Sequence, residues 1–367
     1  MADQEPGRRG ARWMIGLLCV TLLWAFAVLI PAPFAIERPG PVVDALGDFP
    51  TQDGEEPVIV IVGAETFPTS GELNVLSVSI LGSPQAPPNW FEVGGALLDP
   101  TRALVPLGDL YPEGVTTEDR TAAGVAMMRA SQQRAIAAAL GELGEPVSSR
   151  LRLAGVVEDG PSAGVLQEGD AILSVGGVPV RTTAELGAAL AEGPEGIPLR
   201  IGIERQGAET EVSVLPVAPD PESAPMLGVI VYAEFEFPFE VELNLGDIGG
   251  PSAGMMFALA VFDALTPGAL TGGLSISGTG TIDENGRIGA IGGLEQKLWG
   301  ASRAGTDLLL VPMENCGDLP HRIPGDLRVA PVSTLEEAVA AIQIAAAGGT
   351  PPGLERCPAG KFVSSSQ

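Results

Sequence analysis

The sequence predicts a mixed α/β (α+β) protein in which one apolar N-terminal segment precedes two folded domains. Its 367 residues suit two domains of roughly 150 residues each once that segment is set aside. Short β-branched runs alternate with Ala-rich helical segments, a pattern typical of mixed folds. Acidic residues predominate, with 46 Asp and Glu against 20 Lys and Arg, which predicts an acidic surface on the folded part.

An apolar run over residues 13–35 is about as long as the hydrocarbon core of a bilayer requires. Arg8, Arg9 and Arg12 precede this run, and a strongly acidic remainder follows it. The positive flank predicts a single-pass anchor in the cell membrane, with residues 1–12 in the cytoplasm and the rest of the protein outside it. A cleaved signal peptide is the alternative, although such peptides usually have a shorter apolar core.

Charge and motif content exclude several classes of function. A formal charge of −26 argues against nucleic acid binding, which requires clustered Lys and Arg. The sequence has no G-x-x-x-x-G-K-[ST] phosphate-binding loop. Its only histidine, His321, gives no metal-ligand spacing and would have to support a Ser-His-Asp triad alone. We therefore expect no metal, no cofactor and no nucleic acid partner.

The first part of the folded chain is predicted to contain two strands and one long helix. Residues 57–63 are a β-branched run typical of a buried strand, and residues 73–81 alternate between apolar and small polar side chains. Residues 82–114 look irregular. An acidic start followed by Ala and Met predicts a helix over 117–143.

The next part changes to short strands around one helix. The strands are expected at 151–157, 171–175, 199–205 and 210–215, and the helix at 183–192. Asp159-Gly160-Pro161-Ser162-Ala163-Gly164, followed by Gly169-Asp170 and a strand ending in Gly-Gly, resembles a bacterial PDZ domain, which we place at 146–217 with a linker at 218–226. The resemblance implies that a peptide is bound as an added strand. The usual carboxylate-binding loop is not found before Leu151.

Chemistry is expected at Gly249-Gly250-Pro251-Ser252-Ala253-Gly254, which an apolar helix over 255–265 follows. A Gly-rich turn lets the backbone approach a substrate carbonyl, and a serine at a helix start lies near unpaired amides. The backbone amides of Gly249, Gly250 and Ala253 are the candidate oxyanion donors. The alternative is a serine that only caps a helix. Ser162 stands in an identical Pro-Ser-Ala-Gly, but no apolar helix follows it.

Lys297 is the candidate general base. It lies in a predicted helix that ends at Gly305, after a hairpin over 279–288. Eighteen of the 20 basic residues are arginines, and an arginine could not serve as a base because its guanidinium keeps its proton. A buried lysine loses its charge readily and can then deprotonate a serine hydroxyl. The alternative is an ordinary exposed lysine.

Residues 246–339 resemble the proteolytic domain of Lon (S16) peptidases, in which Pro-Ser-Ala-Gly holds the nucleophile and Gly-Gly-Leu-x-x-Lys holds the base. The resemblance implies Ser252 as nucleophile, Lys297 as base and Thr279 as the residue that assists the lysine. It also implies a Lon-type domain over 227–345, with 36–145 as its N-terminal part and the PDZ domain inserted between them.

This arrangement resembles bacterial PDZ-containing Lon-type peptidases, the YlbL-like group. The resemblance implies an ATP-independent, membrane-anchored endopeptidase that acts on protein or peptide substrates outside the cytoplasm. It also implies a homo-oligomeric ring, such as a hexamer. A catalytically silent scaffold or binding protein at the membrane is the alternative.

Three cysteines occur, at 19, 316 and 357. In an oxidising compartment Cys316 and Cys357 would pair and fasten the C-terminal tail, residues 346–367, to the last domain. Two unrelated buried thiols are the alternative. Cys19 lies within the apolar run, where packing is its expected role.

Overall fold

The computed structural model describes residues 6–51, 54–112, 114–145, 147–194, 196–218, 220, 223–244, 249–320, 322–325 and 327–357. His321 and residues 358–367 lie outside the described residues. Contacts divide the chain into a first unit, residues 1–144 with 239–367, and a second unit, residues 145–238. The second unit is therefore inserted in the sequence of the first.

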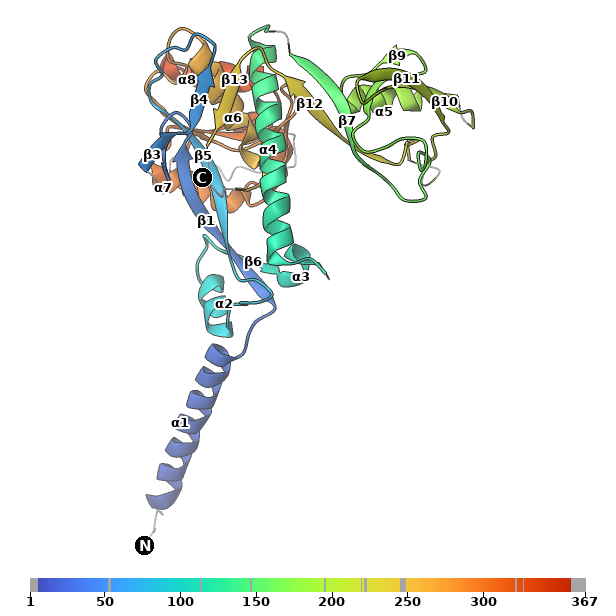
Figure 1. Cartoon of the computed structure of the whole chain (residues 1–367). Coiled ribbons are helices and arrows are strands. Elements are labelled where there is room, and N and C mark those ends of the chain that lie inside the picture. Colours follow the sequence, from blue (N-terminus) through green and yellow to red (C-terminus); the bar gives the residue numbers. More distant parts are fainter. Residues whose placement is uncertain are drawn as a thin grey trace. The chain divides into compact units, whose positions relative to one another are not determined.

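The N-terminal helix α1 covers Pro6–Leu29 (Figure 1). No helix in the described part of the chain is both long enough and apolar enough to cross a membrane. The last residues of the apolar run are also not helical. Strand β1 begins at Phe34, and Ala35 and Ile36 are buried in the first unit. The predicted transmembrane anchor over 13–35 is thus not confirmed.

A six-stranded sheet in the order β18-β17-β14-β5-β1-β6 forms the centre of the first unit. Its strands are β1 (Phe34–Asp44), β5 (Glu72–Leu81), β6 (Ala103–Pro106), β14 (Ser275–Gly278), β17 (Leu308–Pro312) and β18 (Val329–Val332). The four strands from β18 to β5 are parallel, whereas β1 is antiparallel to both β5 and β6. All five residues of β17 are buried, as expected for a parallel strand covered on both faces.

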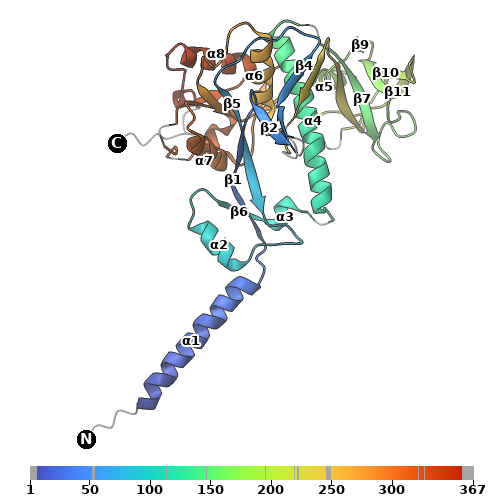
Figure 2. The ribbon, with the colours of Figure 1, turned by 60° about the vertical axis from the view of Figure 1, so that its left-hand side comes forward.

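Two helical layers cover this sheet (Figure 2). On one side α6 (Gly254–Leu265) contacts β5 and packs against α4 (Thr117–Glu142) and α8 (Leu335–Ala346). On the other side α7 (Leu294–Ala304) packs on β1 and β5. The core on the α7 side joins Leu76, Leu298 and Leu309, among others.

Smaller elements complete the first unit. They are β2 (Asp48–Thr51), β3 (Gly54–Pro57), β4 (Ile59–Val62), α2 (Trp90–Leu97), α3 (Leu107–Leu110), β13 (Glu240–Leu243), η1 (Pro251–Ala253), β15 (Thr281–Ile282), β16 (Ile288–Gly289), η2 (Met313–Asp318) and η3 (Leu354–Arg356). The stretch 82–114, predicted to be irregular, contains α2, β6 and α3.

One strand of this unit was missed, and the strand predicted to be buried at 57–63 is only partly buried. Strand β1 was missed because Pro39, Gly40 and Pro41 interrupt the strand pattern, and the structure accommodates them with a register shift between Pro39 and Val42. The apolar run around residues 57–63 does form β4, but β4 pairs only with β13 and lies outside the central sheet. Its β-branched residues predicted the strand correctly but not its partner.

The second unit is a sheet in the order β11-β10-β8-β7-β12, with β9 paired to β8. Its elements are β7 (Ser148–Val156), β8 (Ala171–Val175), β9 (Val178–Pro179), α5 (Thr183–Ala191), β10 (Leu199–Arg205), β11 (Ala208–Val214) and β12 (Val229–Glu236). The Lon-type domain was predicted to cover 227–345, which would include residues 229–236. These residues instead form β12 of the second unit, which pairs along its whole length with β7.

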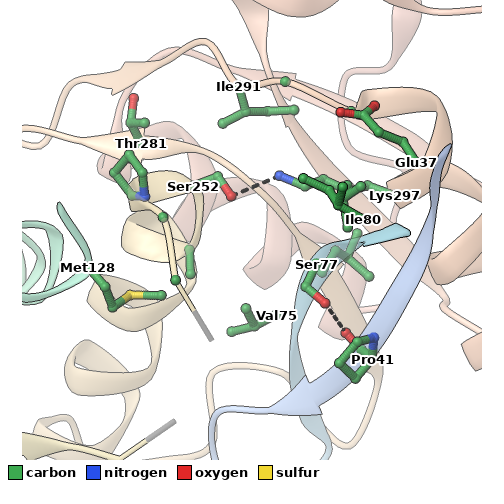
Figure 3. Close-up of a pocket in the computed structure, with 18 of the residues that line it drawn as sticks. Glu37, Pro41, Val75, Ser77, Ile80, Met128, Ser252, Thr281, Ile291 and Lys297 are labelled. Atoms are coloured by element: carbon green, nitrogen blue, oxygen red, sulfur yellow. Dashed lines mark hydrogen bonds between the residues drawn. The ribbon is translucent and has the colours of Figure 1, made fainter. Parts of the chain in front are cut away.

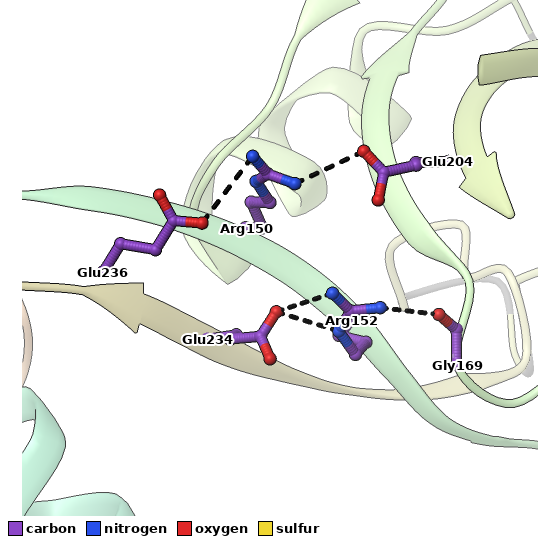
Figure 4. A network of polar contacts seen from close by, with 6 residues as sticks. All are labelled: Arg150, Arg152, Gly169, Glu204, Glu234 and Glu236. Carbon is purple, nitrogen blue, oxygen red and sulfur yellow. Dashed lines mark hydrogen bonds and ion pairs between the residues drawn. The ribbon is translucent and has the colours of Figure 1, made fainter. Parts of the chain in front are cut away.

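Ion pairs connect β7 to its neighbours (Figure 4). Arg152 binds Glu234 of β12 through two guanidinium nitrogens, at 2.9 and 2.7 Å, and donates to the carbonyl of Gly169. Arg150 lies between Glu204 and Glu236 at 3.3 and 3.6 Å. Such partly exposed ion pairs add little to the stability of the unit.

Candidate active site

Ser252 lies in the short helix η1, directly before α6. The turn into η1 requires glycine at position 250, whose backbone has φ 100° and ψ 150°, a conformation that residues with a Cβ rarely adopt. Pro251 then starts the helical turn with a fixed φ. The sequence Gly-Pro-Ser therefore places the serine hydroxyl at the beginning of a buried helix.

Helix α4 and the segment between β14 and β15 hold this nucleophile loop in place. Ser131 of α4 donates a hydrogen bond to the Pro251 carbonyl at 3.0 Å. The amide of Gly250 donates to the carbonyl of Gly124, also on α4, at 3.2 Å. The amide of Gly280 donates to the Ser252 carbonyl at 2.8 Å. Three hydrogen bonds from two separate segments thus fix the backbone on both sides of the serine.

Lys297 reaches the same point from the first turn of α7. Its helix starts at Gly293, which has a left-handed backbone, φ 66° and ψ 32°. A side chain at this position would also collide with Val78, since a Cβ would lie 2.6 Å from its Cγ2. Gly293 therefore lets α7 approach β5 closely. The lysine side chain is 3% exposed.

The three predicted side chains meet at the lysine amine, and Figure 3 shows the contact between Lys297 and Ser252. Lys297 Nζ lies 2.8 Å from Ser252 Oγ and 2.9 Å from Thr279 Oγ1. The fully buried Thr279 hydroxyl donates to the Ser252 carbonyl at 3.1 Å, so its oxygen is left to accept from the lysine. The hydrogen bond to Thr279 thus orients the amine of Lys297 and leaves its lone pair free to face Ser252 Oγ.

Burial lowers the pKa of Lys297 from its usual 10.5 to about 8, because a charged ammonium is poorly solvated there. The nearby carboxylate of Glu37 opposes this shift. In Figure 3 Glu37 lies close to the lysine at the edge of the same cavity. A considerable fraction of the lysine is therefore neutral near pH 8, which is the form that can accept a proton.

A cavity of about 610 Å³ opens on Ser252 and Lys297. Its lining comes from β1, β5, α4, the nucleophile loop and the segment 290–293 before α7. The wall on the β5 side includes Val75, Val78 and Ile80, and Met128 of α4 lies on the other side. This space is large enough to hold several atoms of a chain next to the serine hydroxyl.

One of the three predicted oxyanion donors is already engaged. The amide of Gly250 donates to the Gly124 carbonyl. The amides of Ser252 and Ala253 lie in the first turn of the helical segment η1–α6, where backbone amides point out of the helix start. These two amides have the position that an oxyanion site needs. The amide of Ser252 itself was not predicted.

The second Pro-Ser-Ala-Gly has a purely structural environment. The Ser162 hydroxyl is completely buried and donates to the Leu227 carbonyl at 2.6 Å. No group of three His, Cys, Asp or Glu side chains in the described residues could hold a metal ion. Within the described residues the chemistry is therefore concentrated at Ser252.

Cys316 and Cys357 are joined by a disulfide bond that closes a loop of 41 residues. The loop contains β18 and α8, so the bond fastens the segment after α8 to η2. Cys316 is fully buried, and Cys357 packs on the core beneath α7. Cys19 of α1 is free and exposed.

The fold and the site define an α/β domain that presents a serine to a buried lysine amine, an arrangement used for nucleophilic catalysis in several unrelated folds. The model of the Lon protease (S16) C-terminal proteolytic domain matches residues 246–345, and the model of the PDZ domain matches residues 118–215. The PDZ match begins within α4, whereas contacts place the start of the second unit at residue 145.

Curated relatives agree with the first of these matches. The chain is 34% identical over 110 residues to the Lon protease of Aster yellows witches'-broom phytoplasma, covering 29% of this chain and 14% of that protein. It is 37% identical over 93 residues to the Lon protease of Escherichia coli, covering 24% and 12%. The matched region thus spans less than one sixth of these relatives.

Among solved structures, the PDZ domain of the SdrC-like protein of Listeria innocua matches with 24% identity and a TM-score of 0.21, covering 22% of this chain and 92% of that one. The corresponding domain from Listeria monocytogenes matches with 21% identity and a TM-score of 0.21, covering 22% and 85%.

This chain contains a Lon (S16) C-terminal proteolytic domain together with a PDZ domain, and it is distantly similar to bacterial Lon proteases. The proteolytic domain indicates a serine peptidase, and a PDZ domain implies peptide binding. In the second unit β12 is an edge strand, and among the described residues one side of its backbone has no strand partner. Helix α5 packs beside it.

Proposed function

We propose that this protein is an ATP-independent serine endopeptidase in which Lys297 activates Ser252. The observation that carries this proposal is the 2.8 Å contact between Lys297 Nζ and Ser252 Oγ in a cavity where burial lowers the pKa of the lysine. The absence of a phosphate-binding loop from this sequence supports hydrolysis without nucleotide.

The reaction follows from the geometry around the amine. Neutral Lys297 takes the proton from Ser252 Oγ, which forms a bond to the carbonyl carbon of the substrate. The amides of Ser252 and Ala253 stabilise the oxyanion. The ammonium of Lys297 then gives its proton to the leaving amine, and the C–N bond breaks to give an acyl-enzyme. Water, deprotonated by the same lysine, releases the acyl group and restores Ser252.

Hydrolysis of an unfolded protein without nucleotide tests this function. We expect the purified protein to cleave casein in the absence of ATP, and Ser252→Ala to lose at least about a thousandfold of that activity. The matched control is Ser162→Ala, which changes the same residue type in an identical motif and should keep the activity. Circular dichroism would check that both variants fold. A wild-type protein that cleaves no unfolded substrate would instead favour a silent scaffold.

We also propose that the peptidase acts outside the cytoplasm and is held at the membrane by α1. Disulfide bonds such as Cys316–Cys357 persist in oxidising compartments. Large apolar side chains of α1 are exposed, including Trp13 at 79% and Trp24 at 64%, as in segments that enter an apolar phase. Three arginines at positions 8, 9 and 12 precede them, which favours a cytoplasmic N-terminus.

Protease treatment of intact spheroplasts tests this location. The C-terminal part should be digested from outside, and the full-length protein should stay with the membrane fraction after a high-salt wash. A cytoplasmic protein would serve as the control for intact cells. If the C-terminal part survives until the cells are lysed, the proposed orientation is wrong.

A further inference from the structure

A second cavity, of about 410 Å³, lies beside the nucleophile loop. The N-terminal half of α4 and Tyr111 line it, together with Gly249 and Gly250. Arg120, Gly249 and Gly250 also line the cavity that contains Ser252. The two cavities therefore meet at these three residues, and a peptide that reaches Ser252 has the second cavity next to it.

The charge in this second cavity comes from Arg120. Its guanidinium lies over the Tyr111 ring, 5.0 Å from the ring centroid, and is only partly exposed. Within the described part of the chain it forms no ion pair, whereas Arg102 and Arg356 of the same unit each bind a carboxylate, at 2.9 and 2.6 Å. The described residues that line this cavity include no carboxylate, which is unusual next to a guanidinium in a chain of net charge −26.

The other lining groups leave this charge available. Thr121 donates its hydroxyl hydrogen to the Thr117 carbonyl, and Thr117 donates its own to Gln85. The remaining lining residues besides Tyr111 are apolar or glycine: Ala123, Gly124, Val125, Met127, Gly249 and Gly250. An anion in this cavity would therefore be bound by the guanidinium, with apolar walls around its stem.

The position of Arg120 relative to Ser252 is fixed by the backbone. Arg120 and Gly124 are four residues apart and share one face of α4. The Gly124 carbonyl accepts the hydrogen bond from the Gly250 amide, two residues before Ser252. Glu37, in contrast, lines only the cavity with Ser252, where it would repel an acid. A carboxylate is thus favoured on the Arg120 side of the serine alone.

We propose that this second cavity is a substrate subsite for a carboxylate adjacent to the cleaved bond. The carboxylate is either the side chain of Asp or Glu or the C-terminal carboxylate of the peptide. This inference rests on the proposed peptidase function, because it assigns a substrate preference to the same site.

Paired fluorogenic peptides test the subsite. Starting from a peptide that the wild type cleaves, Asp and Asn would be compared at each position within three residues of the bond, and a free C-terminus would be compared with an amide. We expect kcat/KM to be at least about tenfold higher for one carboxylate form. That ratio should fall to about one in Arg120→Gln and below one in Arg120→Glu. Arg134→Gln, an exposed arginine of the same helix, is the matched control and should keep the wild-type ratio.

The two sources of the carboxylate give different results. A higher kcat/KM for an internal Asp than for Asn assigns the subsite to an acidic side chain. A higher kcat/KM only for the free C-terminus over the amide assigns it to the chain end. If the wild type cleaves all pairs equally, or if Arg120→Gln keeps the ratio, the subsite is refuted while the peptidase function stands. If no peptide is cleaved at all, the peptidase function itself fails.

Discussion

Lys297→Arg should lose at least about a thousandfold in kcat/KM for an unfolded or peptide substrate. Arginine keeps the positive charge and much of the length of the side chain, but its guanidinium does not release a proton at accessible pH. The wild-type amine lies 2.8 Å from Ser252 Oγ and is almost completely buried, so the substitution removes the base that is placed beside the nucleophile. The loss should therefore be in kcat and not in substrate affinity alone.

Lys297→Met is the matched variant, since it removes the charge while keeping a long unbranched side chain. We expect it to be as inactive as the arginine variant but at least as stable as the wild type at pH 7, because it removes the cost of burying an ammonium. A lysine with a merely structural role predicts the reverse order, with more activity in the arginine variant. An Arg variant that cleaves casein near the wild-type rate would contradict the assignment.

The reacting groups could be predicted because short motifs carry them. Pro-Ser-Ala-Gly fixes a turn and a helix start within a few residues, and Lys297 was notable as one of only two lysines. The identical motif at Ser162 shows that the four residues alone do not identify a nucleophile. The two serines differ in their partners, since Ser162 bonds to the Leu227 carbonyl and Ser252 contacts Lys297.

Residues that support the nucleophile from a distance could not be predicted. Ser131 bonds to the carbonyl of Pro251, which is 120 residues away in sequence. Gly124 and Arg120 likewise reach the site only through the packing of α4 on α6. No local pattern marks such contacts, because the sequence pattern of a helix shows which face is apolar but not which segment that helix will contact.

Strand β1 was missed and strand β12 was assigned to the wrong domain, for different physical reasons. Prolines at 39 and 41 argue against a strand, yet a register shift accommodates them and brings Glu37 to the cavity. For β12, the β-branched residues predicted a strand, but pairing depends on the partner, and β7 precedes it by more than 70 residues. The predicted end of the N-terminal apolar segment was too late. Apolar residues such as Ala35 and Ile36 suit a buried strand as well as a helix, so hydropathy alone does not separate the two.

The rate at which Ser252 is acylated should rise about ninetyfold between pH 6 and pH 9. A base with a pKa of about 8 is only about one hundredth neutral at pH 6 and about nine tenths neutral at pH 9. The direction follows from the group, because loss of a proton creates the competent amine, so the rate should rise and then stay level. Glu37 raises the pKa of Lys297, hence Glu37→Gln should move the midpoint to lower pH.

The pH dependence of covalent labelling at Ser252 tests the central claim most directly, since it follows the activation of the nucleophile without substrate turnover. A serine-directed phosphonate would be added at pH 6 to 9.5, and the modified peptide containing Ser252 would be quantified by mass spectrometry. The Ser–Lys mechanism predicts a single rise with a midpoint near pH 8, a lower midpoint in Glu37→Gln and no labelling in Ser252→Ala. A pH-independent rate, or a midpoint near the histidine value of about 6.5 that Glu37→Gln leaves unchanged, would contradict it.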